Sequence, residues 1–445
     1  MTDRVEQTAE RQPARVPRRV AQAVLGALKG GVVPRIGLPH IAVGRRAEIE
    51  TLLRDIDIVA DGGATFRFIV GPYGSGKSFL LQTIRNYAME RGFVVADADL
   101  SPERRLQGSH GQGLATYREL MKNLSVKARP EGGALTLALD RWIDRIRQEV
   151  GGHAAQVEGR IGEVVRSMSD LVHGFDFARL LTLYYRSFVE GDDETKAKVA
   201  KWFRGEYATK TEARQELGVN VIVCDDDWYD YGKLMAFFFR QAGYQGLLVL
   251  VDELVNLYKA PNAITRQYNY EKLLAMYNDA LQGKAQYIGT LMCGTPQSME
   301  DRQRGVYSYE ALRSRLQEGK FGREGARDML APVIRLAPLS AEEMLVLAGK
   351  LADLHASLYG YEKRVTDDDL AAFIKVEYSR VGADQRITPR EVIRDFIELL
   401  DILFQDPSAT LAALLQKGDF VFSAPSGDDG TGAQPDEGLF AHFSL

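Results

Sequence analysis

Hydrophobic positions divide the chain into an α/β part and two helical parts. Apolar runs of strand length lie at residues 65–70, 93–96, 247–251, 287–293 and 333–336. The run at 247–251 is continuously apolar, which is typical of a strand buried on both faces. Between about 130 and 220, and again from 340 to about 404, apolar residues recur at helical spacing. The pattern predicts five strands accompanied by two long helical segments.

The order of elements near residue 70 indicates a parallel sheet. A strand at 65–70 is followed at once by a glycine-rich turn, a helical pattern over 79–89 and a second strand at 93–96. A strand, a helix and a strand in this order form a parallel βαβ unit. Lys77 and Asp252 are 175 residues apart, far more than two further strand–helix units require. We therefore expect a helical insertion between about 100 and 245.

The composition is that of a globular protein with two or three domains. The chain has 445 residues, of which 45% are hydrophobic and 26% are charged. A net charge of −5 argues against a wholly basic nucleic-acid coat and leaves a local basic patch open. Cys224 and Cys293 match no metal or redox spacing. No run reaches the ~18 apolar residues of a membrane helix and no secretory signal is present, so we expect a cytoplasmic protein with no membrane contact.

One motif points to a bound nucleotide. The pattern G-x-x-x-x-G-K-[ST] fits the run Gly71-Pro72-Tyr73-Gly74-Ser75-Gly76-Lys77-Ser78. Its fixed positions are filled by Gly71, Gly76, Lys77 and Ser78. Glycines let the loop wrap tightly, so that backbone N–H groups point at phosphate oxygens. Lys77 is placed for the β- and γ-phosphates, and the Ser78 hydroxyl for Mg²⁺. Because a strand precedes this loop and a helix follows it, the motif predicts ATP and Mg²⁺ as cofactors.

A pair of acids ends the apolar strand at 247–251. Asp252 is placed to hold Mg²⁺, directly or through water, and Glu253 to polarise the attacking water as a general base. A loop that only binds nucleotide does not need the second acid. The pair therefore predicts ATP hydrolysis rather than binding alone.

Four further segments resemble the AAA+ ATPases of the origin-recognition type. Val43-Gly44-Arg45…Glu48 resembles the box that lines the adenine pocket in those proteins. The segment 289–296 resembles the strand that carries a sensor-1 residue, here Thr295. The segment 311–316 resembles the one with an arginine finger, which implies Arg313 or Arg315. The segment 388–393 resembles a sensor-2 helix with Arg390 as the sensor.

More narrowly, the chain resembles the ATP-binding proteins of bacteriophage-exclusion (BREX) systems. The likeness lies in segments 243–247, 305–316 and 388–391, and spans roughly residues 30 to 405. It implies an ATPase that works beside a methyltransferase and other defence-system proteins on DNA. With the motifs, it predicts four regions: a basic N-terminal arm at 1–35, a P-loop AAA+ core at 36–335, a helical lid at 336–405 and an acidic, disordered tail at 406–445. The fold class is α/β with a parallel sheet.

Some assignments have a structural alternative. An arginine finger needs a neighbouring subunit, and Arg313 and Arg315 cannot face the same way on a helix, so at most one of them is the finger. Thr295 is also suited to cap a helix that starts at Pro296. Arg390 follows Pro389 in a first helical turn, where a cation opposes the helix dipole, and a phosphate would be a fitting partner.

Three functions fit these motifs. The first is a DNA-associated ATPase that assembles or remodels a defence complex, the second a slow nucleotide-dependent switch acting on protein partners without DNA contact, and the third a small-molecule kinase. The kinase fits least, since the second acid, the sensors and the lid suit an ATPase. For the first function, a homo-oligomer and double-stranded DNA are the expected partners. Arginines that could touch phosphates lie at positions 11, 15, 18, 19, 302, 304, 313, 315, 323 and 327.

Overall fold

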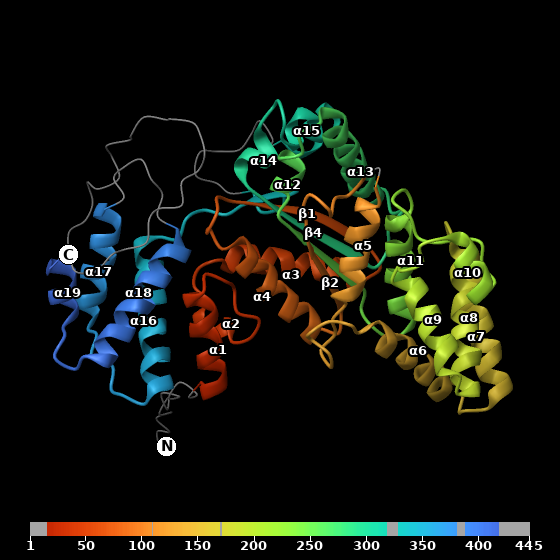
Figure 1. The fold of residues 1–445 in the computed structure, drawn as a ribbon, viewed down its shortest axis with the longest axis horizontal. Helices are drawn as coiled ribbons and strands as arrows, with labels where there is room; N and C mark the ends of the chain where they lie inside the picture. The colour runs from red at the N-terminus through yellow and green to blue at the C-terminus, as the bar shows by residue number, and fades with distance from the viewer. Residues whose placement is uncertain (1–15, 109, 170, 318–327, 381–387, 418–445) are drawn as a thin grey trace, which may run out of the picture. The chain divides into compact units, whose positions relative to one another are not determined.

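The computed structural model describes residues 16–108, 110–169, 171–317, 328–380 and 388–417 (Figure 1). The chain divides into two compact units. The sheet unit comprises Arg45–Pro72 and Leu80–Leu336. The helical unit comprises Met1–Gly44, Tyr73–Phe79 and Ala337–Leu445.

Five parallel strands form the centre of the sheet unit. They are β1 (Ala64–Val70), β2 (Val94–Asp99), β3 (Leu247–Asp252), β4 (Ile288–Gly294) and β5 (Val333–Arg335). Their order across the sheet is β2-β3-β4-β1-β5, and every pairing is parallel. All five strands expected from the hydrophobic pattern are therefore present. The α/β fold class with a parallel sheet is confirmed.

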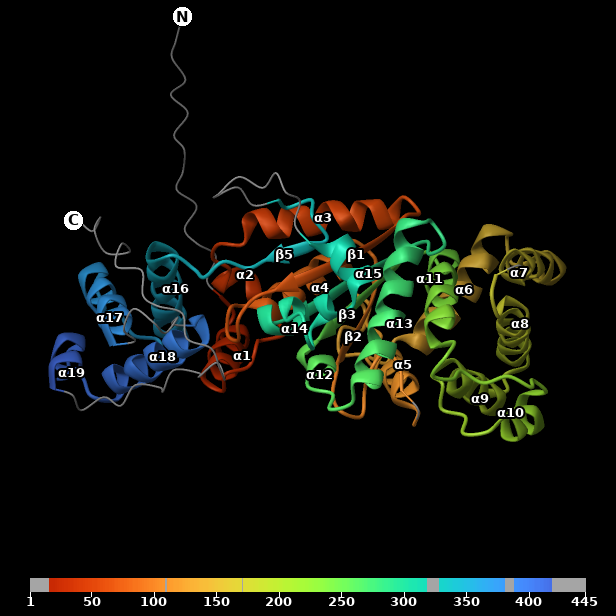
Figure 2. The same ribbon diagram turned by 90° about the horizontal axis from the view of Figure 1, so that it is seen from above.

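Helices cover both faces of the sheet because its side chains alternate between them. Ile69 and Leu248 point to one face, where they pack with α3 (Arg46–Ala60) and α4 (Lys77–Glu90). Phe68 and Val249 point to the other, where they join a larger hydrophobic cluster. That second face is covered by α5 (Gln112–Lys122), α11 (Trp228–Gln241) and α13 (Ala263–Leu281), as Figure 2 shows.

The segment between β2 and β3 is helical, as expected. Besides α5 and α11 it contains α6 (Leu135–Glu149), α7 (Ala154–Ser169), α8 (Gly174–Glu190), α9 (Asp193–Phe203) and α10 (Lys210–Leu217). α5 packs against β2 and α11 against β3, whereas α6–α10 extend beyond the edge of the sheet (Figure 2). Of the described residues between 130 and 220, none lies in a strand. The prediction of a helical insertion is confirmed.

The helical unit contains four C-terminal helices. They are α16 (Ala341–Tyr359), α17 (Asp367–Arg380), α18 (Pro389–Gln405) and α19 (Leu411–Lys417). Their apolar faces meet in one hydrophobic cluster that includes Leu351, Phe373 and Phe396. Among the described residues, no helix is both long and apolar enough to cross a membrane.

The N-terminal arm was expected to span residues 1–35, but part of that range is folded. α1 (Arg18–Lys29) and α2 (Leu38–Ile41) pack against α16, and α1 also packs against α18. Ala21, Val24 and Leu25 are buried in the hydrophobic cluster of the helical unit. Residues 18–41 therefore belong to a folded domain, because one face of α1 is apolar. Residues 1–15 lie outside the described part of the chain.

The start of the C-terminal tail also differs from the expected one. Residues 411–417 form α19, which packs against α17, and Leu411 is buried. The tail assigned to residues 406–445 therefore starts later than expected. Residues 418–445, which hold five of its six acids, lie outside the described residues.

Candidate functional site

The P-loop leaves the sheet at the end of β1. The Gly71 N–H donates to the carbonyl of Gly294, the last residue of β4, at 3.1 Å. Gly74 and Gly76 take φ values of +72° and +91°, a region that favours glycine. α4 then begins at Lys77. The loop therefore joins a strand end to a helix N-terminus, as a phosphate-binding loop requires.

Within the helical unit, the P-loop lies against the start of α18. A Cβ atom added to Gly74 would lie 2.5 Å from Thr388 Cβ, so only glycine fits there. Thr388 caps α18: its backbone N–H and its hydroxyl both donate to Glu391 Oε2, at 3.1 and 2.9 Å. Arg390, the expected sensor-2 residue, lies in the exposed first turn of this helix. The structure thus brings the Arg390 helix and the middle of the P-loop together.

Lys77 itself is almost fully buried. Its Nζ lies 5.5 Å from the centre of the Tyr73 ring, close enough for a cation–π contact. Val43 and Phe79, which follows Ser78, pack against the same hydrophobic cluster of the helical unit. The expected adenine-pocket segment therefore shares its hydrophobic support with the end of the P-loop.

Gly44 has a second close approach. Its φ is +64°, and an added Cβ would lie 2.7 Å from Oε1 of Glu343. Glu343 belongs to the capping box that starts α16, where its carboxylate accepts the Ser340 N–H at 2.9 Å. The Val43-Gly44 segment thereby lies against the N-terminus of α16.

Asp252 and Glu253 lie at the carboxyl end of β3, in the sheet unit. Glu253 has a φ of +60°, a conformation that non-glycine residues seldom adopt. Its N–H donates to Asp252 Oδ1 at 2.8 Å, and the next N–H, of Leu254, donates to the carbonyl of Cys293 on β4 at 3.0 Å. The chain therefore turns sharply after Asp252. Such strain is often kept at functional positions.

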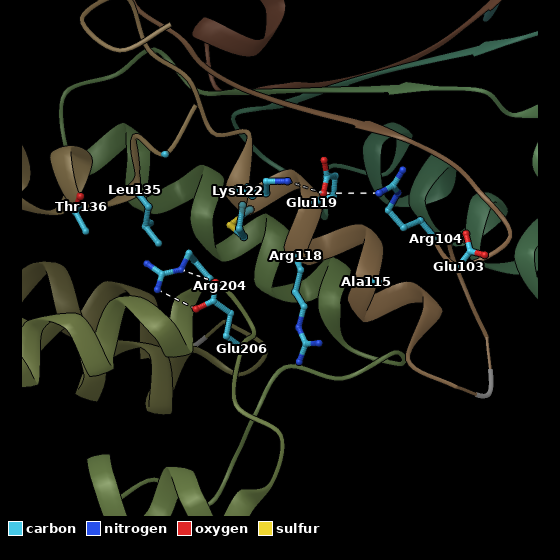
Figure 3. A pocket seen from close by; sticks show the side chains of 12 residues that line it. Glu103, Arg104, Ala115, Arg118, Glu119, Lys122, Leu135, Thr136, Arg204 and Glu206 are labelled. Atoms are coloured by element: carbon cyan, nitrogen blue, oxygen red, sulfur yellow. Dashed lines mark hydrogen bonds and ion pairs between the residues drawn. The ribbon is translucent and has the colours of Figure 1, made fainter. Parts of the chain in front are cut away.

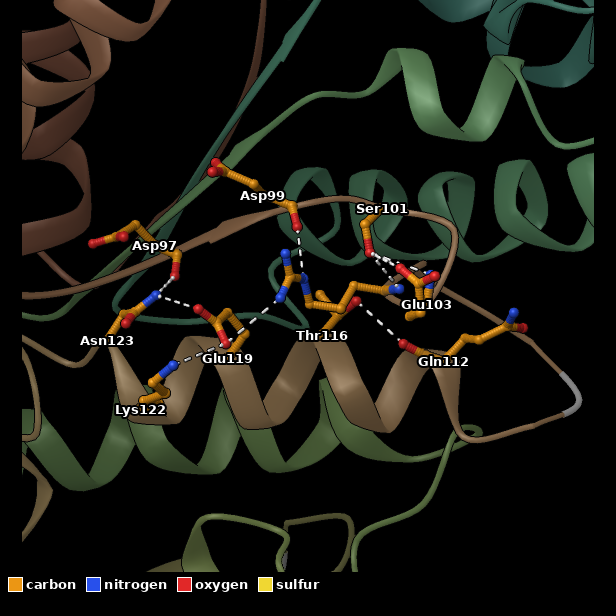
Figure 4. Close-up of polar contacts among 10 residues, drawn as sticks. Asp97, Asp99, Ser101, Glu103, Gln112, Thr116, Glu119, Lys122 and Asn123 are labelled. Carbon is orange, nitrogen blue, oxygen red and sulfur yellow. Dashed lines mark hydrogen bonds and ion pairs between the residues drawn. The ribbon is translucent and has the colours of Figure 1, made fainter. Parts of the chain in front are cut away.

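A third acid at this edge was missed by sequence reasoning. Asp99 ends β2 and stands opposite Asp252 in the strand register. Burial raises the pKa of Asp99, and the nearby carboxylates of Asp252 and Asp97 raise it further. Figure 4 shows Asp97 and Asp99 near the end of β2. Arg104 Nε donates to the Asp99 carbonyl at 2.9 Å. The available signal was the alternation Ala-Asp-Ala-Asp directly after an apolar strand.

Thr295 follows β4 and caps a helix. Its hydroxyl accepts the Ser298 N–H at 3.2 Å, and the Ser298 hydroxyl accepts the Thr295 N–H at 3.0 Å. Pro296 is the first residue of the short α14 (Pro296–Glu300). The capping alternative is therefore confirmed. A sensor role for Thr295 stays a prediction.

The two candidate fingers lie on α15 (Glu310–Leu316). Arg313 is partly buried, and its Nη2 is 3.6 Å from Glu310 Oε1. Arg315 is exposed, and its Nη1 donates to the carbonyl of Ala311 at 2.7 Å. Both guanidinium groups thus rest against their own helix. Their role toward a neighbouring subunit stays a prediction.

Residues 16–419 match the protein family described as BREX system ATP-binding protein BrxC/D. A search of curated proteins found no similar sequence. Among solved structures, the chain is similar to the crystal structure of domain III from the Thermotoga maritima replication initiation protein DnaA. That likeness has 14% sequence identity and a TM-score of 0.36, and covers 87% of this chain and 97% of that one.

Proposed function

The chain belongs to the family of BREX system ATP-binding proteins, and we propose that it hydrolyses ATP with Mg²⁺ at its P-loop to drive a DNA-associated defence complex. The observation that carries this proposal is the pair Asp252 and Glu253 at the end of β3. β3 is separated from the P-loop strand β1 by β4 alone. A family that only bound ATP would not need a carboxylate base there.

Each residue has a task in the proposed reaction. Backbone N–H groups of the P-loop and Lys77 bind the phosphates, and Arg390 reads the γ-phosphate. Mg²⁺, held by the Ser78 hydroxyl and the Asp252 carboxylate, would neutralise developing phosphate charge. These oxygen donors suit Mg²⁺, which is usually bound by one or two protein groups together with phosphates and water. Glu253 accepts a proton from the attacking water, and Thr295 orients that water.

Carboxylates that stayed protonated would bind Mg²⁺ or accept a proton less well than ionised ones. Asp99 is the acid whose pKa burial and Asp252 raise. A bound divalent cation would favour its ionised form again, because opposite charges stabilise each other. The three acids at the ends of β2 and β3 therefore fit a cationic ligand.

Association with DNA is the second part of the proposal. The chain as a whole is acidic, so contact with DNA would need local arginines. Arg304 is engaged inside the sheet unit, donating to the carbonyls of Tyr258 and Ala260 at 3.4 Å each. Arg18 and Arg19 are exposed at the start of α1. Arg11, Arg15, Arg323 and Arg327 lie outside the described residues.

The test is the ATPase rate with and without double-stranded DNA at low and moderate salt. Phosphate contacts weaken steeply with salt, so stimulation that fades between about 50 and 200 mM supports DNA association. An ATPase rate that DNA never changes, at any salt, favours the alternative of a slow switch acting on protein partners. Absence of ATP turnover under all conditions would refute the hydrolysis part.

A further inference from the structure

A groove of about 680 Å³ opens within the helical insertion of the sheet unit (Figure 3). It lies between α5, the start of α6 and the turn after α9, and its apolar lining includes Ala115, Met121 and Leu135. Its volume is within the usual range for ligand sites, roughly 300–1,000 Å³. None of its lining residues belongs to the P-loop or to the end of β3.

Two of the three acids on its rim are paired with cations, and the third, Glu103, accepts the Ser101 hydroxyl at 2.9 Å. Glu119 lies between two cations, with Arg104 Nη1 at 3.8 Å and Lys122 Nζ at 3.7 Å from its Oε2. Glu206 accepts two bonds from Arg204, at 2.8 and 2.9 Å (Figure 3). These pairs leave little negative charge to repel an anionic ligand.

Arg118 is the cation of this rim without a carboxylate. Its Nε donates to the carbonyl of Gly205 at 2.6 Å, and no ion pair of Arg118 is found among the residues that the structure describes. The guanidinium is exposed and extends from α5 toward the turn after α9 (Figure 3). Its remaining N–H groups are suited to a planar carboxylate, which can take two parallel bonds.

We propose that this groove binds an acidic peptide segment of a partner protein. A carboxylate of the peptide pairs with Arg118, and a neighbouring apolar side chain covers Ala115, Met121 and Leu135. An apolar centre with a charged rim is the usual anatomy of a protein interface. Duplex DNA fits less well, because its phosphate backbone offers no apolar group to cover Ala115, Met121 and Leu135.

The groove is also attached to the end of β2. Arg104, on its rim, donates through Nε to the carbonyl of Asp99, whose strand partner is Asp252. The Leu100 N–H also donates to the Asp252 carbonyl, at 3.1 Å. A peptide that moves Arg104 therefore acts on the strand end next to the proposed magnesium ligand. This coupling rests on the proposed function, whereas binding does not.

Binding is tested on the full chain by fluorescence anisotropy. The probe is a fluorescein-labelled decapeptide of alternating glutamate and leucine, compared with glutamine–leucine, glutamate–glycine and lysine–leucine versions. We expect the glutamate–leucine peptide to bind most tightly. Arg118→Glu should weaken it at least about tenfold, since one charge-assisted pair becomes a repulsion. Ala115→Trp, which fills the apolar part without changing charge, should weaken it as well.

Arg186→Glu is the matched control, because Arg186 is an exposed arginine of α8 outside the groove. Its affinity should equal that of the wild type, and all variants should share one melting temperature. No binding of the glutamate–leucine peptide up to about 1 mM, or equal loss with Arg186→Glu, would overturn the proposal. The proposal would also be overturned if Arg118→Glu weakened the binding of a labelled DNA duplex and left peptide binding unchanged.

Coupling has its own readout. Saturating peptide should change the ATPase rate of the wild type, and Arg104→Gln should bind peptide but lose that response. A wild-type protein that hydrolyses ATP and binds peptide with no change in rate would disprove the coupling and leave the docking site intact. A protein that binds peptide but never hydrolyses ATP would instead refute the proposed function.

Discussion

At the scale of single residues, the proposed site depends on unusual backbone conformations. Glu253 adopts a left-handed conformation that costs roughly 1–3 kcal/mol in a non-glycine residue. Gly74 adopts a similar one in the P-loop, where it also touches Thr388. The first could not be foreseen, because a sequence motif names residue types and not their φ angles. Gly74 occupies an unspecified position of the P-loop motif, so its requirement for glycine comes from the contact with Thr388.

Gly74→Ala tests this contact, with Gly283→Ala as the matched control. Gly283 has nearly the same φ, +73°, but an added Cβ would meet open space. Gly283→Ala should cost about 1 kcal/mol of unfolding free energy from backbone strain alone. Gly74→Ala should cost a further ~1–3 kcal/mol, because the Cβ forces Thr388 and the start of α18 to shift. It should also lower ATP affinity in calorimetry, and equal effects of the two substitutions would contradict the contact.

At the scale of elements, the strands were predictable and the ends of the helical unit were not. Strands β1–β5 are short apolar runs between turn residues, and such runs are buried whatever surrounds them. α1 carries three basic residues, Arg18, Arg19 and Lys29, and such charge is also typical of a solvated arm. Its apolar stripe can be recognised as a packing face only together with α16 and α18, which follow more than 300 residues later. α19 was not predicted for the same reason, because its packing partner is a separate helix. It also lies in a segment with an acidic composition.

A polar cluster fixes α1 to α16 and α18. Lys29 Nζ donates to Asp401 Oδ2 at 2.6 Å, and His355 Nε2 lies 3.0 Å from Asp401 Oδ1. The other ring nitrogen of His355 is 2.8 Å from the Tyr361 hydroxyl. Burial raises the pKa of Asp401, but the hydrogen bonds from His355 and Lys29 outweigh it and hold this pKa below its usual value.

Asp401→Asn should therefore reduce stability in a pH-dependent way. The folded protein binds the Asp401 proton more weakly than the unfolded chain does, so the contribution is present above about pH 4 and is lost as pH falls through the lowered folded-state pKa. Near pH 7 we expect a loss of about 2 kcal/mol in urea unfolding, typical of bonds to a charged group. The loss should shrink below about pH 4.

The control is Asp353→Asn, which removes an exposed ion pair with Lys363 on the same helical unit. Such surface pairs contribute ~0–1 kcal/mol. If Asp401→Asn were no more damaging than Asp353→Asn, or its effect were constant with pH, the cluster would not fix α1.

At the scale of the whole molecule, the sequence predicted the residues of a nucleotide site, and their joint action stays a prediction. Motif spacing identified the P-loop and the acids after β3, because both depend on local strand–turn geometry. Asp99 was missed because its position opposite Asp252 depends on the pairing of β2 with β3 across the insertion. The choice between Arg313 and Arg315 depends on the position of a second subunit, which the sequence of one chain does not give.

A shared site makes ATP turnover depend on assembly. Specific activity should rise with protein concentration, and one of Arg313→Ala or Arg315→Ala should lose turnover while it still binds ATP. An arginine supplied to the transferring phosphate can be worth ~10³–10⁵ in rate. Mixing the inactive arginine variant with Lys77→Ala protein should restore activity, because a subunit that cannot bind ATP can still lend its arginine. Activity independent of concentration, with both arginine variants fully active, would favour a monomeric switch.

The central claim is that Glu253 is the base of an ATP-hydrolysing P-loop, and Glu253→Gln tests it most directly. Calorimetry with ATP and Mg²⁺, together with phosphate release, should show affinity close to wild type and turnover lower by ~10²-fold or more, because glutamine keeps the shape and loses the base. Lys77→Ala, measured beside it, should lose ATP binding itself. Equal loss of binding in both variants, or full turnover with Glu253→Gln, would contradict the account.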